Sequence, residues 1–483
     1  MSHIRFGTSG WRGVISEDFT FFNVRRAAQA ICNHLKTHPE FGIKALPQNP
    51  RTVLVGYDTR FLSEQFAAEA AGVFAANGFK VLFSRQDVPT PALAHAVGHR
   101  KSLGAVNITA SHNPANYNGI KWTPYWGGPA IPPITQDIER FCDLITDHDI
   151  HFHPQGKAQK EDRWEESDFK PPYLKQLHQL LDWKTIKRAG PKLGVDCLYG
   201  TARHYLPEIL RAWGCEVQPL HLQRDVLFGN GMPEPSPETL SELTGYVRRK
   251  YANLGLACDG DADRFGLLDE GGVWISPNEF LGLLLHHLVQ NRGWKGKVVR
   301  SVMTSHFVDA VAKFHGLEVR ETPVGFKYIG ELLREGEYIL GGEESGGLSL
   351  KGHVPEKDGI LACLLAVEIV STEKKSLSQI KNFLFKQVGP THSQRINCRI
   401  PNPHLIREIQ EKLKLRPPLD LAGSSVWRID ETDGFKFLLK DGSWLGLRLS
   451  GTEPVARLYL EAASPKMLDK LLEAGKKLLK GEF

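Results

Sequence analysis

The chain is poor in cysteine, with 7 among 483 residues. The count is odd, the positions are scattered, and no two cysteines form a Cys-x-x-Cys pair. Such a pattern argues against a disulfide framework. We therefore predict reduced, mostly buried thiols.

Long hydrophobic runs are also missing. The first residues contain no apolar signal segment, and the two richest apolar stretches, 280–289 and 361–370, are interrupted by His286, His287 and Glu368. A membrane-spanning helix needs about 20 consecutive apolar residues. The sequence therefore predicts a cytoplasmic protein without a membrane partner.

No charge of one sign dominates, because 60 Lys and Arg residues face 55 Asp and Glu residues, for a net charge of +5. Small basic clusters in such a chain usually mark solvated faces, so nucleic acid is not an expected partner. The Gly-x-x-x-x-Gly-Lys-Ser/Thr loop that cradles nucleotide phosphates is absent as well. ATP is therefore not implied.

The length suggests about three or four domains. Three stretches show a strand, helix, strand rhythm that is typical of open α/β units, whereas the last hundred residues mix extended segments with two helices. We predict an α/β fold of three related α/β domains and a C-terminal α+β domain, with linkers at 151–168, near Pro277 and near Thr391. The predicted domains are 1–168, 169–276, 277–390 and 391–483. The predicted strands include 52–57, 80–84, 105–108, 193–198, 216–220, 254–258, 265–268, 297–302, 318–322 and 338–341, and the predicted helices include 63–77, 202–213, 237–251, 305–314, 326–334 and 465–480.

The segment Asp259-Gly-Asp-Ala-Asp-Arg264 places three carboxylates and an arginine between two predicted strands. Carboxylates that converge on a tight loop favour a hard cation such as Mg²⁺. An EF-hand fits poorly, because Arg264 stands where that loop needs glycine and the flanks are strands. A phosphatase of the haloacid dehalogenase type would use Asp259 as nucleophile but expects Thr or Val at position 263. A turn without metal is the remaining alternative, which mutual repulsion of the carboxylates disfavours.

A serine beside a histidine, Ser111 and His112, follows the predicted strand 105–108. The segment could be an ordinary turn, since Ser, Asn and Pro are common there. A serine phosphoester would be stabilised by a Mg²⁺ and arginine set of the kind proposed at 259–264. Ser111 is thus a candidate nucleophile.

Two later loops contain groups that bind anions and hydroxyls. Residues 448–454 combine a guanidinium, hydroxyls and glycine, which suits a phosphate dianion, although a simple strand end would look similar. Residues 342–346 could orient sugar hydroxyls through carboxylate and serine oxygens, or form a flexible acidic turn.

Taken together, five segments in order resemble the α-D-phosphohexomutase superfamily, which includes phosphoglucomutases and phosphomannomutases. These segments are 7–13, 109–114, 259–264, 342–347 and 448–454. The resemblance spans the whole chain. It implies four domains around a central cleft, three of them of related α/β topology.

The resemblance also implies a chemistry. Ser111 would carry a phosphoryl group that passes to a hexose phosphate, giving a hexose 1,6-bisphosphate that serves as intermediate and activator. Mg²⁺ would be held by Asp259, Asp261, Asp263 and a phosphoserine oxygen. By matching position, the catalytic candidates are Ser111, His112, Lys121, Arg12 and Arg264, and the substrate-binding candidates are Glu343, Ser345, Lys357, Arg448, Ser450, Gly451, Thr452 and Arg457.

Departures from the family patterns bear on the substrate. Val324 stands where phosphoglucomutase-like sequences usually have Thr, whereas Glu344 and Gly347 replace the Gln and His that are typical of phosphoglucosamine mutases. The expected substrates are hexose phosphates, with glucose favoured through Lys327 and Lys357, and mannose as a second substrate. A hexose 1,6-bisphosphate synthase on the same scaffold, a phosphatase acting through Asp259 and a silent sugar-phosphate-binding protein remain alternatives. The expected assembly is a monomer or weak dimer.

Overall fold

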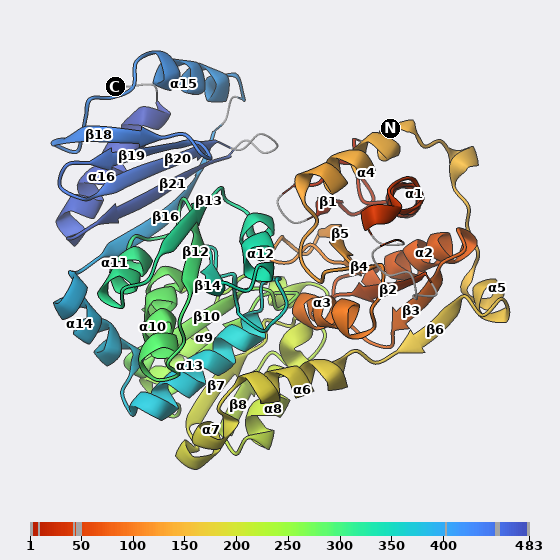
Figure 1. The fold of residues 1–483 in the computed structure, drawn as a ribbon, viewed down its shortest axis with the longest axis horizontal. Coiled ribbons are helices and arrows are strands. Elements are labelled where there is room, and N and C mark those ends of the chain that lie inside the picture. The colour runs from red at the N-terminus through yellow and green to blue at the C-terminus, as the bar shows by residue number, and fades with distance from the viewer. Residues whose placement is uncertain are drawn as a thin grey trace. The chain divides into compact units, whose positions relative to one another are not determined.

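The computed structural model describes residues 3–7, 10–41, 44, 51–400, 403–449 and 455–480, with the backbone alone at 403 and 404. By its internal contacts the chain divides into two compact units. One unit comprises residues 1–277 and 325–378, and the other comprises 278–324 and 379–483. Figure 1 shows the secondary-structure elements of the chain.

The first sheet has the order β1-β5-β4-β2-β3-β6. Strand β2 pairs in parallel with β3 and β4, whereas β5 runs antiparallel to β4 and β1. The strands are β1 (Trp11–Val14), β2 (Thr52–Tyr57), β3 (Lys80–Ser84), β4 (Gly104–Ile108), β5 (Tyr117–Pro124) and β6 (Trp164–Ser167). The helices that belong with them are α1 (Phe21–Thr37), α2 (Ser63–Ala76), α3 (Thr90–His99), α4 (Pro132–Leu144) and α5 (Gln155–Lys160).

Helices cover both faces of this sheet. Val53 and Val55 of β2 point into the core that contains buried residues of α1, α2 and α4. On the other face a Cβ at Gly56 would lie 2.9 Å from Leu93 of α3, so the glycine allows α3 to pack closely against the strand. Figure 1 accordingly shows β2 between α2 and α3. The arrangement is the α/β layering that the sequence predicts.

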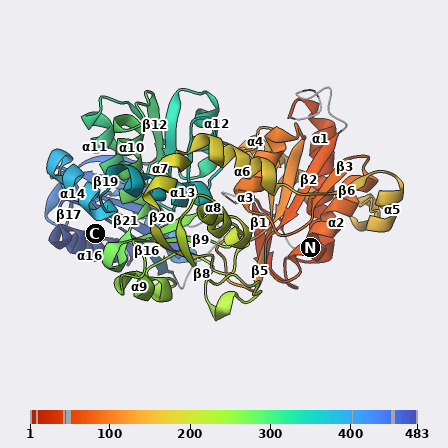
Figure 2. The ribbon, with the colours of Figure 1, turned by 90° about the horizontal axis from the view of Figure 1, so that it is seen from below.

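The predicted linker at 151–168 is wrong. Residues 155–160 form α5, and β6 adds to the sheet edge in parallel with β3, with Trp164 opposite Val81. Trp164 is buried and its ring stacks on Phe83 at 4.8 Å. Figure 2 shows β6 beside α5 at this edge. A short strand whose middle residues are charged, Glu165 and Glu166, has no hydrophobic pattern to detect.

The second sheet has the order β11-β10-β9-β7-β8, with β7 parallel to β8 and β9, and β10 antiparallel to β9 and β11. Its strands are β7 (Lys192–Asp196), β8 (Glu216–Leu220), β9 (Leu254–Cys258), β10 (Phe265–Asp269) and β11 (Val273–Ile275). The helices of this region are α6 (Lys170–Leu180), α7 (Trp183–Ala189), α8 (Leu206–Ala212) and α9 (Ser241–Arg248), and α13 (Gly359–Glu373) packs against β9 and β10.

Two predicted helices in this region are too long. The predicted helix 202–213 is split at Tyr205 into a 3-10 turn, Thr201–His204, and α8, because Pro207 provides no backbone N–H and fits only the first turn of a helix. In place of the predicted helix 237–251 the structure has the shorter helix α9. Both differences concern helix ends, which pattern alone locates poorly.

The third α/β stretch contributes elements to both units. In the first unit β14 (Tyr338–Gly342) pairs antiparallel with β15 (Leu348–Leu350), next to α12 (Phe326–Arg334). In the second unit β12 (Lys297–Ser301) pairs in parallel with β13 (Val319–Thr322). The helices here are α10 (Pro277–Gln290), which begins where a linker was predicted, α11 (Phe307–Phe314) and α14 (Leu377–Val388).

The C-terminal sheet has the order β16-β21-β20-β19-β18-β17, and its pairings are antiparallel. Helix α16 packs on β21 and closes the core around Leu458 and Leu471. This domain is α+β, as predicted. Its strands are β16 (His392–Arg399), β17 (Asp420–Leu421), β18 (Ser424–Asp430), β19 (Phe435–Leu439), β20 (Trp444–Leu449) and β21 (Val455–Ala462), and its helices are α15 (Pro403–Leu415) and α16 (Pro465–Leu479).

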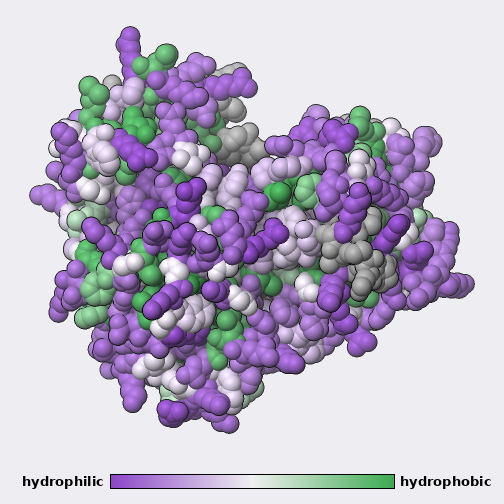
Figure 3. Space-filling model, in the orientation of Figure 1, coloured by the Kyte–Doolittle hydropathy of each residue, from purple (hydrophilic) through white to green (hydrophobic). Residues whose placement is uncertain are grey.

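The hydrophilic surface and the free cysteines agree with what the composition predicts. The face in Figure 3 is mostly hydrophilic, with hydrophobic residues in small separate groups. Among the helices of the described residues, none combines the length and apolar character needed to cross a bilayer. All seven cysteines are free and six are buried, which confirms the predicted thiols.

Candidate active site

The candidate site lies in the first unit, where two loops meet at the carboxyl ends of β4 and β9. Ser111 lies just beyond β4, and its hydroxyl donates a hydrogen bond to Oδ2 of Asp259, just beyond β9, at 2.7 Å. Both side chains are buried. Open α/β sheets bind ligands at this end of their strands. Ser111 and the acidic cluster of Asp259, Asp261 and Asp263 therefore share one site, although Ser111 and Asp259 are 148 residues apart in sequence.

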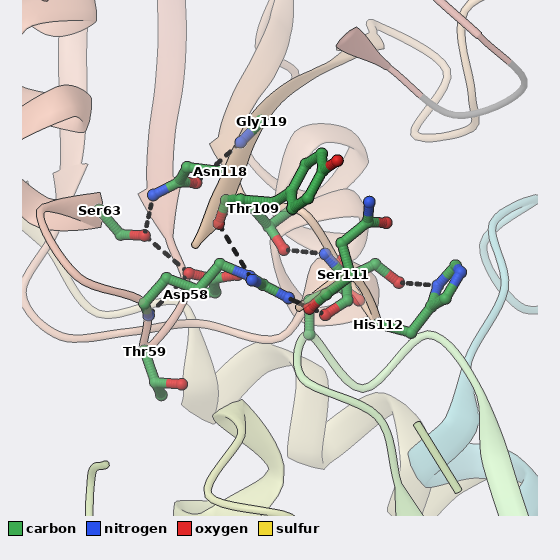
Figure 4. Close-up of polar contacts among 12 residues, drawn as sticks. Asp58, Thr59, Ser63, Thr109, Ser111, His112, Asn118 and Gly119 are labelled. Carbon is green, nitrogen blue, oxygen red and sulfur yellow. Dashed lines mark hydrogen bonds and ion pairs between the residues drawn. The ribbon is translucent and has the colours of Figure 1, made fainter. Parts of the chain in front are cut away.

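The loop that carries Ser111 is strained. Ser111 has φ of +53°, in the left-handed region that a residue with a side chain seldom adopts. Its N–H donates to Oγ1 of Thr109 at 2.9 Å, and its Oγ lies 3.3 Å from Nδ1 of His112. Figure 4 shows these side chains and the polar contacts around them. Local strain of this kind persists only where the surrounding structure holds it.

The three carboxylates of Asp259, Asp261 and Asp263 are buried and place ligand atoms within 4.8 Å of one another. Oδ1 of Asp261 and Oδ1 of Asp263 are buried without a hydrogen-bond partner. Buried carboxylate oxygens are costly to leave unpaired. A divalent cation would satisfy these oxygens, so the donor set fits a hard metal ion.

Burial raises the pKa of Asp259 well above its ordinary value, and the charges of Asp263 and Asp261 raise it further. Burial also opposes ionisation of Asp263, but the ammonium groups of Lys121 and Lys357 prevail and hold the pKa of that carboxyl low. The three acids are therefore electrostatically unequal. A cation among them would favour ionisation of all three.

Lys121 comes from β5 and points into the acidic cluster. Its Nζ lies 2.6 Å from Oδ2 of Asp261 and 2.8 Å from Oδ2 of Asp263. Although burial acts in the opposite direction, these carboxylates raise the pKa of Lys121. The sequence suggests Lys121 as an acid or a base. With a raised pKa it holds its proton and balances the charge of the two carboxylates as a buried cation.

Two arginines complete the cationic part of the site. Nη1 of Arg12, on β1, donates to Oδ1 of Asn113 at 2.6 Å. Arg264 donates its backbone N–H to Asp259 at 3.0 Å and pairs with Glu234 at 3.1 Å, and its Nε is buried without a hydrogen-bond partner. Burial and the charge of Arg264 lower the pKa of Arg12. Two guanidinium groups close enough to repel each other favour an anion such as phosphate between them.

The loop after β14 brings Glu343 towards the same cations. Glu343 is buried, its Oε1 accepts from the N–H of Gly325 at 2.7 Å, and Ser345 of the same loop is half-exposed. Lys357 pairs with Asp263 at 3.2 Å and with its neighbour Glu356 at 3.0 Å, so its ammonium group is held at the acidic cluster. A Cβ at position 347 would lie 2.3 Å from Cδ of Lys357, so a side chain there requires Lys357 to move.

We expect Glu343 to make stability depend on pH. Burial, reinforced by Glu344, raises the pKa of Glu343 from 4.5 to about 7. The unfolded chain loses this proton first, so the free energy of unfolding should fall as pH rises from about 4.5 to about 7, by roughly 3 kcal/mol. Denaturant unfolding at pH 4.5, 6 and 8 measures it. Glu343→Gln should remove this component, and an unchanged pH slope in the variant would contradict the assignment.

The remaining predicted phosphate contacts belong to the second unit. Arg448 on β20 and Arg457 on β21 are cross-strand partners, and Nε of Arg448 pairs with Asp433 at 2.8 Å. The predicted ligands Ser450, Gly451 and Thr452 lie outside the described residues.

Several residues that support the site were not predicted from the sequence. Thr90 donates to Asp261 at 2.6 Å, and Glu234 pairs with Arg264. Asp58 and Arg60, directly after β2, contact the serine loop. The signal for this last pair was available, because two charged residues follow an apolar strand at the edge where ligands bind.

Comparisons with known proteins identify the family of the chain. Four family models match, described as "Phosphoglucomutase/phosphomannomutase", alpha/beta/alpha domains I (residues 3–148), II (171–272) and III (276–388), and C-terminal domain (396–476). The "Phosphoglucomutase/phosphomannomutase" of Thermococcus kodakarensis is 32% identical, covering 98% of each chain. The "Probable phosphoglucosamine mutase" of Methanopyrus kandleri is 31% identical over 96% of this chain and 95% of its own.

Among solved structures, a "putative phosphomannomutase" from Thermus thermophilus superposes with a TM-score of 0.85 at 32% identity. The match covers 99% of this chain and 100% of the other. Fold, domain order and whole-length sequence similarity thus point the same way. The chain belongs to the phosphoglucomutase/phosphomannomutase family of phosphohexomutases and is an isomerase of the intramolecular phosphotransferase type.

Proposed function

We propose that the protein interconverts hexose 1-phosphate and hexose 6-phosphate through a phosphoserine at Ser111 and a hexose 1,6-bisphosphate intermediate. The observation that carries the proposal is the 2.7 Å hydrogen bond from Ser111 to Asp259, which supports a role for the Ser111 hydroxyl as nucleophile beside the acidic cluster. Asp259 itself is a poor nucleophile, because one oxygen accepts from Ser111 and the other from the N–H of Arg264. This favours the mutase over a phosphatase that acts through Asp259.

Each residue of the site receives a proposed role that suits the charge of its side chain. We assign Arg12 and Arg264 to the transferring phosphoryl group, Lys121 and His112 to proton transfer at the attacked hydroxyl, and Glu343 and Ser345 to sugar hydroxyls. Asp259, Asp261 and Asp263, with an oxygen of Ser111, would hold Mg²⁺, which when bound supplies Lewis acidity at the phosphoryl oxygens. The remaining substrate contacts are assigned to Lys357, Arg448, Ser450, Gly451, Thr452 and Arg457.

Glucose phosphate is the substrate that we favour, with mannose phosphate second. A phosphoglucosamine mutase typically has His at position 347, where here the stem of Lys357 fills the space that a Cβ would need. The related proteins include mutases named for glucose, mannose and glucosamine, so they do not decide between these substrates. Our preference for glucose over glucosamine rests on the close packing of Lys357 against Gly347. Rates with glucose, mannose and glucosamine 1-phosphates at equal concentration test it, and a higher kcat/KM for glucosamine would reverse it.

The main test is product analysis. The protein, incubated with glucose 1-phosphate, Mg²⁺ and a trace of glucose 1,6-bisphosphate, should produce glucose 6-phosphate in amounts far above the bisphosphate added. Phosphorus NMR follows each species. Accumulation of the bisphosphate in place of the 6-phosphate would indicate a bisphosphate synthase, and release of inorganic phosphate alone would indicate a phosphatase.

Bound Mg²⁺ should stabilise the fold, because it would satisfy the unpaired oxygens of Asp261 and Asp263. A ligand at about 100 times its Kd adds about 2.7 kcal/mol to the free energy of unfolding. Denaturant unfolding with Mg²⁺ or with a chelator measures the difference. Asp261→Asn should abolish it.

Asp269→Asn is the matched control for this measurement. Asp269 is buried like Asp261 but caps backbone N–H groups of Leu377 and Ser378, away from the cluster. This variant should keep the Mg²⁺ effect. An equal Mg²⁺ effect in Asp261→Asn would place the metal elsewhere.

The free cysteines also support a reducing compartment. We therefore retain the cytoplasm as the proposed location.

A further inference from the structure

We propose that Arg60, held by Asp58, is a positioning residue that fixes the strained conformation of the Ser111 loop and thereby sets the rate of phosphoryl transfer. The inference rests on the proposed function, because it concerns the geometry of the same nucleophile. Neither residue reaches the Ser111 hydroxyl. Both act on the backbone that carries it.

The guanidinium of Arg60 is fully buried and uses all five of its N–H donors. Nε donates to Oδ2 of Asp58 at 3.1 Å. Both terminal nitrogens donate to backbone carbonyls of the serine loop. The distances from Nη2 are 2.7 Å to O of Ser111 and 2.6 Å to O of Asn113, and those from Nη1 are 2.7 Å to O of Pro114 and 3.0 Å to O of Tyr117.

Four carbonyls that converge on one cation require a sharply curved backbone. The loop between β4 and β5 must therefore turn its carbonyls inward, which is consistent with the left-handed φ of Ser111. Without a donor at the centre these carbonyls would repel one another, and each would lose the hydrogen bond that Arg60 donates to it. The guanidinium thus offsets the strain that the turn stores.

Asp58 neutralises and orients the arginine. Its Oδ1 accepts from the N–H of Arg60 at 3.0 Å and from the hydroxyl of Ser63 at 2.7 Å, and the side chain of Thr109 is also hydrogen-bonded to it. Because the Thr109 hydroxyl in turn accepts from the N–H of Ser111, the carboxylate is connected to the nucleophile by two routes. Figure 4 shows Asp58, Thr109 and Ser111 in this network.

The network extends to the segment after β8. Arg224 donates to the carbonyl oxygens of Thr59 and Arg60, at 3.1 and 3.3 Å, and the Phe228 ring lies 5.0 Å from the Arg60 guanidinium carbon. These contacts add to those from the serine loop. Arg60 is therefore restrained both at its backbone and at its guanidinium.

Arg60→Lys tests the inference. Lysine keeps the charge but offers three donors from a single point, so it cannot bridge Asp58 and four carbonyls. A shift of the nucleophile by about 1 Å can cost about 100-fold in rate. We expect kcat per folded molecule to fall about 100-fold and KM to change by less than about threefold, since the residue touches no substrate.

Arg26→Lys is the control for loss of a buried arginine in the same domain. Arg26 is 3% exposed and its Nε donates to the carbonyl of Cys142 at 2.6 Å, between α1 and α4. This variant should lose stability and keep kcat. If Arg60→Lys behaves in the same way, Arg60 is merely structural and the proposal is wrong.

Hydrogen exchange provides a readout that does not depend on turnover. In the wild type the N–H groups of Asn113 and Tyr117 are hydrogen-bonded within the loop. Arg60→Lys should accelerate their exchange, whereas amides of α4 should exchange as before. Unchanged loop exchange would contradict the proposed role.

Thr109→Val decides the case if Arg60→Lys does not fold. Valine preserves the shape of threonine but removes the hydroxyl that joins Asp58 to the Ser111 N–H. We expect kcat to fall about 10-fold with KM unchanged, and a wild-type kcat would overturn the proposal. Wild-type protein without mutase activity or phosphoserine would instead refute the proposed function, so the two failures are distinguishable.

Discussion

Replacement of Ser111 by alanine is expected to reduce kcat by about 10⁴-fold or more, because removal of a nucleophile eliminates the covalent route and leaves only binding. The fold should survive, since among the described residues the partners of the Oγ are Asp259 and His112, both within the site. Coupled enzyme assays with glucose 1-phosphate measure the fall in kcat. Thermal unfolding measures the stability of the variant.

Ser102→Ala provides the matched control. Ser102 is buried in the same domain, and its hydroxyl donates to the backbone carbonyls of Val97 and Gly104, outside the site. Its activity should remain near that of the wild type. If Ser111→Ala retained activity, a nucleophile such as Asp259 would have to replace the serine, and the mutase mechanism would be abandoned.

Replacement of Asp263 by asparagine should have the second largest effect, a loss of kcat of about 10²- to 10³-fold. The substitution removes one carboxylate of the acidic cluster and leaves Lys121 and Lys357 with less negative charge within 3.2 Å. Two buried ammonium groups then repel any cation at the cluster. The Mg²⁺ concentration for half-maximal activity should accordingly rise.

The control again is Asp269→Asn, which removes a buried carboxylate from the end of β10 without touching the cluster. It should lower stability and leave the Mg²⁺ requirement unchanged. Equal Mg²⁺ titration curves for Asp263→Asn and the wild type would show that Asp263 does not hold the ion.

The parts of the fold that the sequence predicted are those with a strong hydrophobic pattern. Strands β2, β3 and β9 are runs of mostly buried residues, and their bounds were predicted within a residue. Strand β6 was missed because its inner residues are charged. Helix α8 was predicted too long because Pro207 fits only the first turn of a helix, so that α8 begins at Leu206 and the residues before it form a separate 3-10 turn.

Much the same holds for the site. The motifs around Ser111 and Asp259 were located from sequence because each groups several charged or hydroxyl side chains within a few residues after a predicted strand. The place of Asp58 and Arg60 after strand β2 could have been noticed, but the role of Arg60 could not be predicted, since its partners include four backbone carbonyls and residue types do not show where a carbonyl points. The left-handed Ser111 was equally invisible, because φ depends on those partners. The sequence thus suggests which groups react, and the structure shows which contacts hold them.

The most direct test of the account is the mass of the wild-type protein after incubation with glucose 1,6-bisphosphate and Mg²⁺, followed by mapping of the modified peptide. The account predicts one added phosphoryl group, on Ser111, which leaves when glucose 1-phosphate or glucose 6-phosphate is added. An unmodified protein, or a phosphoryl group on any other residue, would contradict it.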